Sequence, residues 1–201
     1  ETAGIAFGQL AGEFLRTKVV PELDAFRFAS YAGTTGISKI SAGASLTTGE
    51  AAIAAIRVGN SKMDEDEVDP NNRYLFITPT LLGLIQDMET TKSKEVLQNF
   101  AGIRKVPQSR FYTAISQYDG STSGEEAGGY VKDSTSGCDI NFMIIEKSAV
   151  IQFEKHVAPK IITPDQNQNA DAYKFGYRNV GIADVYDNKV AGIYLHHKAK
   201  G

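Results

Sequence analysis

Apolar side chains recur at mostly four-residue steps near the start of this 201-residue chain. Charged residues separate them, and such spacing places the apolar side chains on one face of an α-helix. Pro21 lies within the series, and proline lacks an amide hydrogen and clashes with the preceding helical turn. The pattern therefore predicts either one kinked helix or two helices, the second starting at Pro21. The series consists of Leu10, Phe14, Val19, Leu23 and Phe26.

The glycines and threonines at 33–36 end this helix, and 37–45 has the pattern of a loop or short strand. Residues 47–50 (TTGE) have the sequence of a capping box, in which a threonine hydroxyl and a glutamate carboxylate each satisfy a free amide. A second helix should follow this box. Its buried side should carry Ile53, Ile56 and Met63.

The middle of the chain alternates short apolar runs with turn residues. We expect a turn at 69–72, a buried strand at 74–77, a helix at 80–88 that begins at Thr78-Pro79, and a strand within 100–111. Residues 118–137 are rich in glycine, serine, threonine and glutamate. Because such a segment buries little apolar surface, it is predicted to be a mobile loop.

The last quarter of the chain predicts two apolar strands, a polar loop at 163–171 and a long strand with alternating polarity. A turn at 187–189 then leads into a final strand at 190–197. In the alternating strand, aromatic residues at 173, 175 and 177 are separated by Lys174, Gly176 and Arg178. Side chains alternate across a strand, so the aromatic face should pack on the N-terminal helix while Lys174 and Arg178 point outward.

Composition indicates a globular fold, because 42% of the residues are hydrophobic and 22% are charged. The length suits one large or two small domains. A net charge of −3 argues against a domain whose role is to bind phosphate groups, because such domains usually carry a basic surface. No apolar run reaches the roughly 20 residues of a membrane span. The one cysteine, Cys138, cannot form a disulfide within the chain. We expect it to be an inert thiol, which suits a reducing cytoplasm. Because the chain starts at Glu1 without a signal peptide, we expect a fragment or a processed product.

The sequence offers no catalytic, cofactor-binding or metal-binding residues, so we expect a protein that is not an enzyme and has no cofactor. The acidic run at 64–67 points around a helix and is expected at a solvated helix end. His196 and His197 face opposite sides of a strand and are expected at its solvated end. The glycines at 124–129 lack the spacing of a phosphate-binding loop, and the serines at 121–123 lack that of a nucleophile elbow.

Three stretches in order, 11–33, 68–86 and 140–198, resemble the major capsid protein of tailed bacteriophages and prophages of the Hong Kong 97 type. The first resembles that family's spine helix and the second its first axial-domain strand and helix. The resemblance implies an α+β fold with a long spine helix, a peripheral-domain sheet and an axial α/β domain. By this resemblance the spine helix is 1–32, the axial domain 33–144 with a C-terminal strand at 188–201, and the peripheral strands 145–187.

The resemblance also implies a head shell subunit that self-assembles into an icosahedral procapsid and capsid enclosing DNA. Its partners would be other copies in hexamers and pentamers, a scaffold, a portal and packaged DNA, with no membrane. It would be located in the virion, and in the host cytoplasm during assembly. The family's N-terminal arm and most of its extended loop would precede Glu1, so the fragment is expected to be monomeric. Two alternatives are an encapsulin-like nanocompartment shell and a small-molecule-binding α/β domain or enzyme.

Four charged residues are candidate contacts between neighbouring subunits in such a shell. They are Arg16 and Glu22 in the predicted helix, and Lys174 and Arg178 on the outward face of the ribbon. For Lys174 and Arg178, simple solubility of an exposed strand is an equal alternative.

Overall fold

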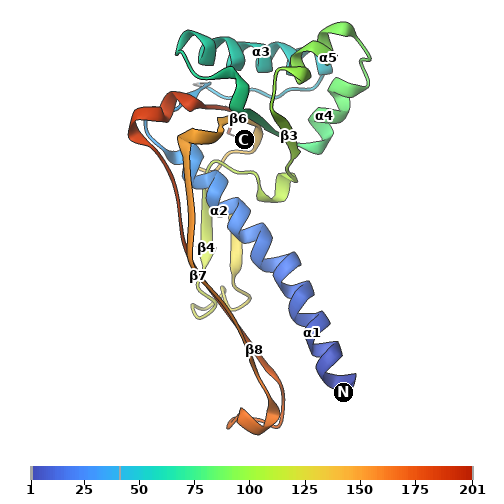
Figure 1. Ribbon diagram of the computed structural model, residues 1–201, viewed down its shortest axis with the longest axis vertical. Helices are drawn as coiled ribbons and strands as arrows, with labels where there is room; N and C mark the ends of the chain where they lie inside the picture. Colours follow the sequence, from blue (N-terminus) through green and yellow to red (C-terminus); the bar gives the residue numbers. More distant parts are fainter. Residues whose placement is uncertain (1, 41, 201) are drawn as a thin grey trace.

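One long helix runs from the far end of the molecule into its centre (Figure 1). The structure is a computed structural model that describes residues 2–40 and 42–200. The helix consists of α1 (Thr2–Phe14), a π turn η1 (Leu15–Val19) and α2 (Val20–Gly33), without a break.

The π turn lies directly before the proline. The amide of Val20 donates to the carbonyl of Leu15, five residues back, and Pro21 is the second residue of α2. A wider turn accommodates the missing amide and the bulk of the proline ring. One continuous helix with an irregularity near Pro21 is thus confirmed, and a break into two separate helices is wrong.

A five-stranded sheet forms the head of the molecule. Its strand order is β1 (Ser38–Lys39), β9 (Ile193–His197), β6 (Ile140–Glu146), β2 (Arg73–Ile77) and β3 (Gly102–Lys105). The pairs at the two edges are parallel, and β6 is antiparallel to both of its neighbours. The expected strands at the start, middle and end of the chain therefore meet in one sheet.

Three helices cover one face of this sheet, and the end of α2 reaches the other face (Figure 1). The three are α3 (Gly49–Glu65), α4 (Pro79–Gln86) and α5 (Thr91–Gln98). Short helical turns join the elements: η2 (Pro70–Asn72), η3 (Gln108–Arg110), η4 (Lys147–Ala149), η5 (Pro164–Gln166) and η6 (Asp187–Gly192). The turn expected at 69–72 and the helix expected from Thr78-Pro79 are confirmed.

Every residue of β6 is buried, because both faces of the sheet are covered. Phe142 and Ile144 pack in the apolar cluster under α3, α4 and α5. Met143 and Ile145 point the other way, into a second cluster that includes the end of α2. A strand covered on both faces has a continuous apolar sequence, which explains the run at 142–145.

The start of α3 differs from the expected capping box by one residue. The hydroxyl of Thr48, and not that of Thr47, accepts from the amide of Ala51 at 3.2 Å. Glu50 is then the second residue of the helix, one position short of the third position that reciprocal capping requires. The helix start at this point is confirmed, and the capping box is wrong.

The segment predicted as a mobile loop at 118–137 contains part of a β-hairpin. β4 (Ile115–Tyr118) pairs antiparallel with β5 (Gly129–Lys132), and only residues 119–128 form the connecting loop. The carboxylate of Asp119 orders that loop, because it accepts from the amides of Ser121 and Thr122, each at 2.7 Å. Local hydrogen bonds therefore replace the buried apolar contacts that the segment lacks.

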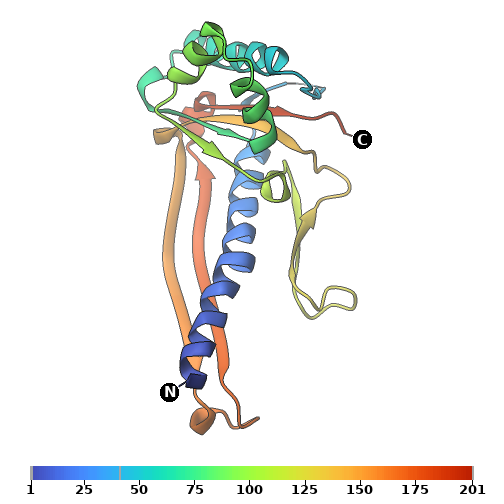
Figure 2. The ribbon, with the colours of Figure 1, turned by 90° about the vertical axis from the view of Figure 1, so that its right-hand side faces the viewer.

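A second, longer hairpin accompanies the helix along its length (Figures 1 and 2). β7 (Val150–Ile162) pairs antiparallel with β8 (Lys174–Val185), with a bulge between Glu154 and His156. This β7–β8 ribbon and the helix α1–α2 together form a limb that extends from the head. The predicted polar loop at 163–171 joins the two strands at the tip of the limb.

The environment of His196 differs from the expectation. His196 is buried, its ring stacks on Phe142 with centroids 5.0 Å apart, and its Nδ1 lies 3.0 Å from Nδ2 of Asn141. The solvated strand end expected for it is wrong, because β9 lies between β1 and β6 inside the sheet. His197 is half-buried.

Burial should make His196 a source of acid sensitivity. Desolvation, together with the charge of His197, lowers the pKa of His196 from 6.5 to about 4. Between pH 6.5 and about pH 4 the native state then binds fewer protons than the unfolded chain, so the free energy of unfolding should fall as the pH drops through this window. The loss should approach 3 kcal/mol, from about 1.4 kcal/mol per pKa unit.

Urea unfolding at pH 7 and pH 5 measures this effect. We expect His196→Asn to be less stable than the parent at pH 7, because the stacking on Phe142 is lost, and to lose less stability on going to pH 5. Equal pH dependence of the two proteins would contradict the buried, neutral histidine.

The contact between α3 and β9 depends on a glycine. A Cβ added at Gly59 would lie 2.7 Å from Cδ1 of Tyr194 and 3.0 Å from Cδ1 of Ile144. Both side chains are buried, so Gly59→Ala should lower the free energy of unfolding by about 1–3 kcal/mol. Gly83→Ala in α4 is the matched control, because an added Cβ there meets nothing within 4 Å and should stabilise the helix by up to about 1 kcal/mol. Thermal or urea unfolding of both variants tests the pair.

Candidate assembly surface

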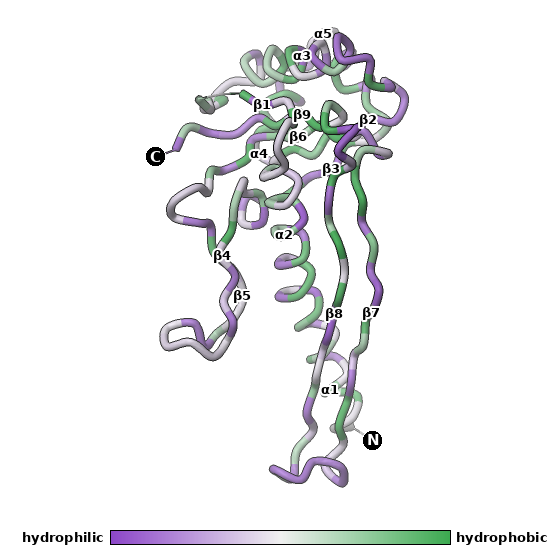
Figure 3. Tube along the Cα trace, turned by 90° about the vertical axis from the view of Figure 1, so that its left-hand side faces the viewer, coloured by the Kyte–Doolittle hydropathy of each residue, from purple (hydrophilic) through white to green (hydrophobic). Residues whose placement is uncertain are grey.

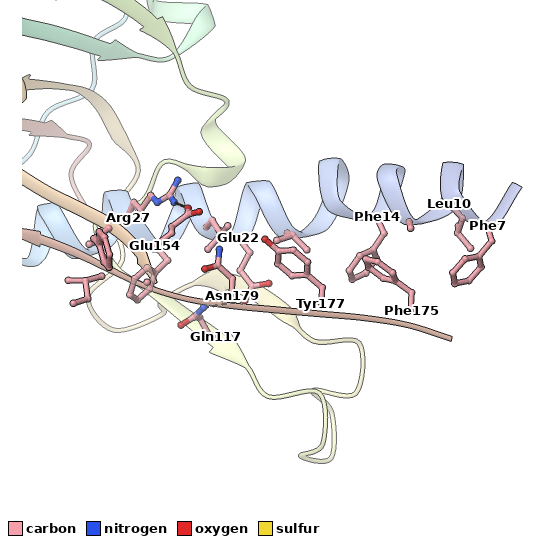
Figure 4. A pocket seen from close by; sticks show the side chains of 18 residues that line it. Phe7, Leu10, Phe14, Glu22, Arg27, Gln117, Glu154, Phe175, Tyr177 and Asn179 are labelled. Atoms are coloured by element: carbon pink, nitrogen blue, oxygen red, sulfur yellow. Dashed lines mark hydrogen bonds and ion pairs between the residues drawn. The ribbon is translucent and has the colours of Figure 1, made fainter. Parts of the chain in front are cut away.

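A groove of about 780 Å³ lies between the helix and β8 (Figure 4). Its outer part is aromatic: Phe7 stacks on Tyr173 with centroids 5.2 Å apart, and Phe14 meets Phe175 edge-on at 6.1 Å. Its inner part is polar, and there Glu22, Arg27, Gln117, Glu154 and Asn179 line the wall. The groove has apolar walls and mixed polar groups at one end, and no convergent set of catalytic side chains.

Three polar contacts attach α2 to three different segments. Arg27 forms an ion pair with Glu154 of β7 (Figure 4). Nη1 of Arg110, in η3, lies 2.9 Å from Oδ2 of Asp24. The amide of Gln117 in β4 donates to Glu22 at 3.2 Å. These contacts, which the sequence did not reveal, place the ribbon and the shorter hairpin around the helix.

The predicted facing of β8 is confirmed. Phe175 and Tyr177 are half-buried and line the groove, whereas Lys174 and Arg178 are exposed on the opposite face. The aromatic side is only partly covered, however. Phe14 is 45% exposed, so the limb does not enclose a fully buried core.

The β7–β8 ribbon carries large exposed apolar side chains. Phe153 pairs across the strands with Ile182; both border the groove, and they are 59% and 58% exposed. Val180, two residues from Ile182 along β8, is 41% exposed. Neighbouring exposed apolar residues typically mark an interaction surface. Figure 3 shows apolar and polar segments side by side along the ribbon.

The four candidate contact residues occupy different environments. Arg16 is exposed and bound to Glu13 of its own helix. Glu22 lines the groove, where it accepts from Gln117. Lys174 and Arg178 share the outer face of the ribbon. The structure thus brings Lys174 and Arg178 together and separates them from Arg16 and Glu22.

The acidic run at 64–67 is engaged in local ion pairs. Asp64 lies 2.7 Å from Nη1 of Arg73, and Asp66 lies 2.7 Å from Nζ of Lys62. Within residues 2–40 and 42–200, no group of three or more His, Cys, Asp or Glu residues is arranged to hold a metal ion. No helix in this described part is long and apolar enough to cross a membrane.

Comparisons with known proteins identify the fold but no sequence family. No family model and no curated protein matches the chain. A chain from Mycobacterium phage Che8 is similar in structure, with a TM-score of 0.55 and 9% identity, over 89% of this chain and 58% of that one. A chain from the capsid structure of cyanophage P-SCSP1u has a TM-score of 0.50 and 17% identity, over 90% and 61%. The chain thus spans about three-fifths of either structure's length and has a fold like that of phage capsid structures.

The aromatic contacts of the groove can be tested by truncation. Phe175→Ala should lower the free energy of unfolding by about 1–3 kcal/mol, less than the roughly 3–5 kcal/mol typical of a fully buried phenylalanine. Val180→Ala, on the exposed face of the same strand, should change it by less than about 0.5 kcal/mol. Urea unfolding of the two variants measures the difference. Equal losses would show that β8 does not present its aromatic face to the helix.

Proposed function

We propose that this protein is a structural subunit of an icosahedral phage head of the Hong Kong 97 type. Many copies would assemble into the shell that encloses the DNA. The observation that carries this proposal is the similarity to a phage capsid structure over nine-tenths of the chain. A limb with exposed apolar side chains supports it, because such surfaces are expected to be covered by neighbouring copies. The role is structural and non-enzymatic.

The proposed division of the chain follows the two parts of the molecule. The peripheral part is the spine helix at 1–32 together with the strands at 145–187. The axial part is 33–144 together with the final strand at 188–201. Pairing of β9 with β6 in the head sheet supports a C-terminal return to the axial part, and β6 ends at Glu146, at the junction.

Partners and location follow from the same proposal. Other copies would form hexamers and pentamers, a scaffold and a portal would take part in assembly, and DNA would fill the shell. The protein would be located in the virion, and in the host cytoplasm during assembly. Arg16, Glu22, Lys174 and Arg178 remain candidate contacts between copies. Lys174 and Arg178 are exposed on the ribbon, whereas Arg16 is paired with Glu13 and Glu22 accepts from Gln117.

Electron microscopy tests the proposal. The protein expressed from its complete gene, alone or with the genes beside it, should form closed shells of uniform diameter. Dilution should leave the shells intact, because each copy is held by several neighbours at once. A protein that stays monomeric at high concentration and with its neighbouring gene products would contradict the proposal.

A further inference from the structure

Three cations gather on the outer face of the β7–β8 ribbon. Lys160 is paired across the strands with Gly176, which stands between Lys174 and Arg178 in β8. Side chains two residues apart share a face, so the three cations lie together. All three are exposed, and none has an ion-pair partner in the described part of the chain.

Three carboxylates gather in the loop of the β4–β5 hairpin. Asp119 and Glu126 are exposed and Glu125 is half-buried, and in residues 2–40 and 42–200 none of them forms an ion pair. Hydrogen bonds within the loop fix their positions, since Oε2 of Glu126 accepts from the amide of Gly124 at 3.0 Å. Backbone hydrogen bonds also hold the pKa of Asp119 well below its usual range, so this charge persists in mild acid.

The two charged surfaces cannot meet within one copy. Figures 2 and 3 show the β4–β5 hairpin on one side of the helix and the β7–β8 ribbon on the other. Different surfaces on opposite sides of a molecule form a heterologous contact between copies, and repetition of such a contact gives a ring or an open array.

Apolar side chains accompany the charges on both surfaces. Val180, which alternates with Asn179 and Gly181 of the groove, is 41% exposed on the cationic face of the ribbon, and Val131 of the hairpin is 40% exposed. Complementary charge can therefore orient the two surfaces while apolar contact stabilises them.

We propose that the acidic β4–β5 hairpin of one copy docks on the cationic outer face of the β7–β8 ribbon of a neighbouring copy. The occupant of the ribbon face is thus a second copy of this chain. This inference rests on the proposed function, since it names the surface through which shell subunits meet.

Charge reversal with compensation tests the contact. Glu125→Lys with Glu126→Lys reverses the hairpin, Lys174→Glu with Arg178→Glu reverses the ribbon, and the four changes together restore opposite signs. Sedimentation of the protein expressed from its complete gene measures self-association at about 0.05 M and about 0.5 M salt. Screening shortens the reach of surface charges from roughly 14 Å to 4 Å over this range, so each reversal should have its larger effect at low salt. The hairpin reversal alone, or the ribbon reversal alone, should weaken self-association about tenfold at low salt. The four-site variant should return to within about threefold of the parent.

Matched controls separate charge from folding. Lys92→Glu with Lys94→Glu makes the same charge change as the ribbon reversal on exposed positions of α5, and should leave association unchanged. Glu125→Gln with Glu126→Gln removes the charge and keeps oxygen acceptors for the loop amides, so it should weaken association less than the reversal does. Carbodiimide coupling of mixed ¹⁴N and ¹⁵N protein should join Glu125 or Glu126 of one copy to Lys160 or Lys174 of another.

The outcomes distinguish the two proposals. If the protein expressed from its complete gene never self-associates at either salt concentration, the proposed function fails and this contact fails with it. If the parent associates but both reversals behave like the α5 control, the contact is wrong and the shell function stands. If the hairpin reversal weakens association and the four-site variant does not recover, the hairpin meets a different surface and the contact is again wrong.

Discussion

The limb depends on the burial of one end of its helix in the head. Phe28 is 8% exposed and meets Phe76 and Phe111 with ring centroids 5.4 and 4.8 Å apart. Tyr31 and Ala32, one turn further on, join the same apolar cluster. Full burial of a phenylalanine is worth about 1.5–3 kcal/mol, whereas within residues 4–14 of α1 only Ala11 is buried. The direction of the limb is therefore set where α2 enters the core.

The polar contacts of α2 add orientation to this anchor. Isolated ion pairs near a protein surface contribute at most about 1 kcal/mol each, so Arg27–Glu154 and Asp24–Arg110 are not the main source of stability. They do, however, attach the ribbon and the η3 segment to successive positions of one helix. A change at α2 should consequently move the surrounding segments together.

Long periodic patterns made much of the limb and head predictable from sequence. The apolar face of the N-terminal helix, the buried strand β6 and the facing of β8 follow from the spacing of apolar residues, because each has one strongly preferred environment over many residues. Spacing left open whether the helix continues through Pro21 or breaks there. The hairpin β4–β5 was not predicted. Its order comes from hydrogen bonds between the Asp119 side chain and backbone amides rather than from apolar periodicity. The Tyr130-Val131 pair was the available signal for a strand there.

Tertiary placement explains the remaining differences. The burial of His196 depends on which strands flank β9, and no local pattern carries that information. α5 was missed although Thr90 provides an ordinary N-cap for it, with its hydroxyl accepting from the amide of Ser93 at 3.2 Å. For the candidate contacts, alternation predicted the exposure of Lys174 and Arg178. It gave no indication that Glu22 would be held by Gln117, 95 residues later in the chain.

The two aromatic pairs of the limb fix the position of the ribbon along the helix. Phe7 and Phe14 are seven residues apart in a helix, about 10.5 Å, whereas Tyr173 and Phe175 are two residues apart in an extended chain, about 6.8 Å. The two spacings differ. A slide of the ribbon that brought one of its aromatic side chains to a new partner on the helix would therefore leave the other without one. Only one relative position satisfies both contacts. The two contacts therefore hold the outer part of the ribbon at one position along α1.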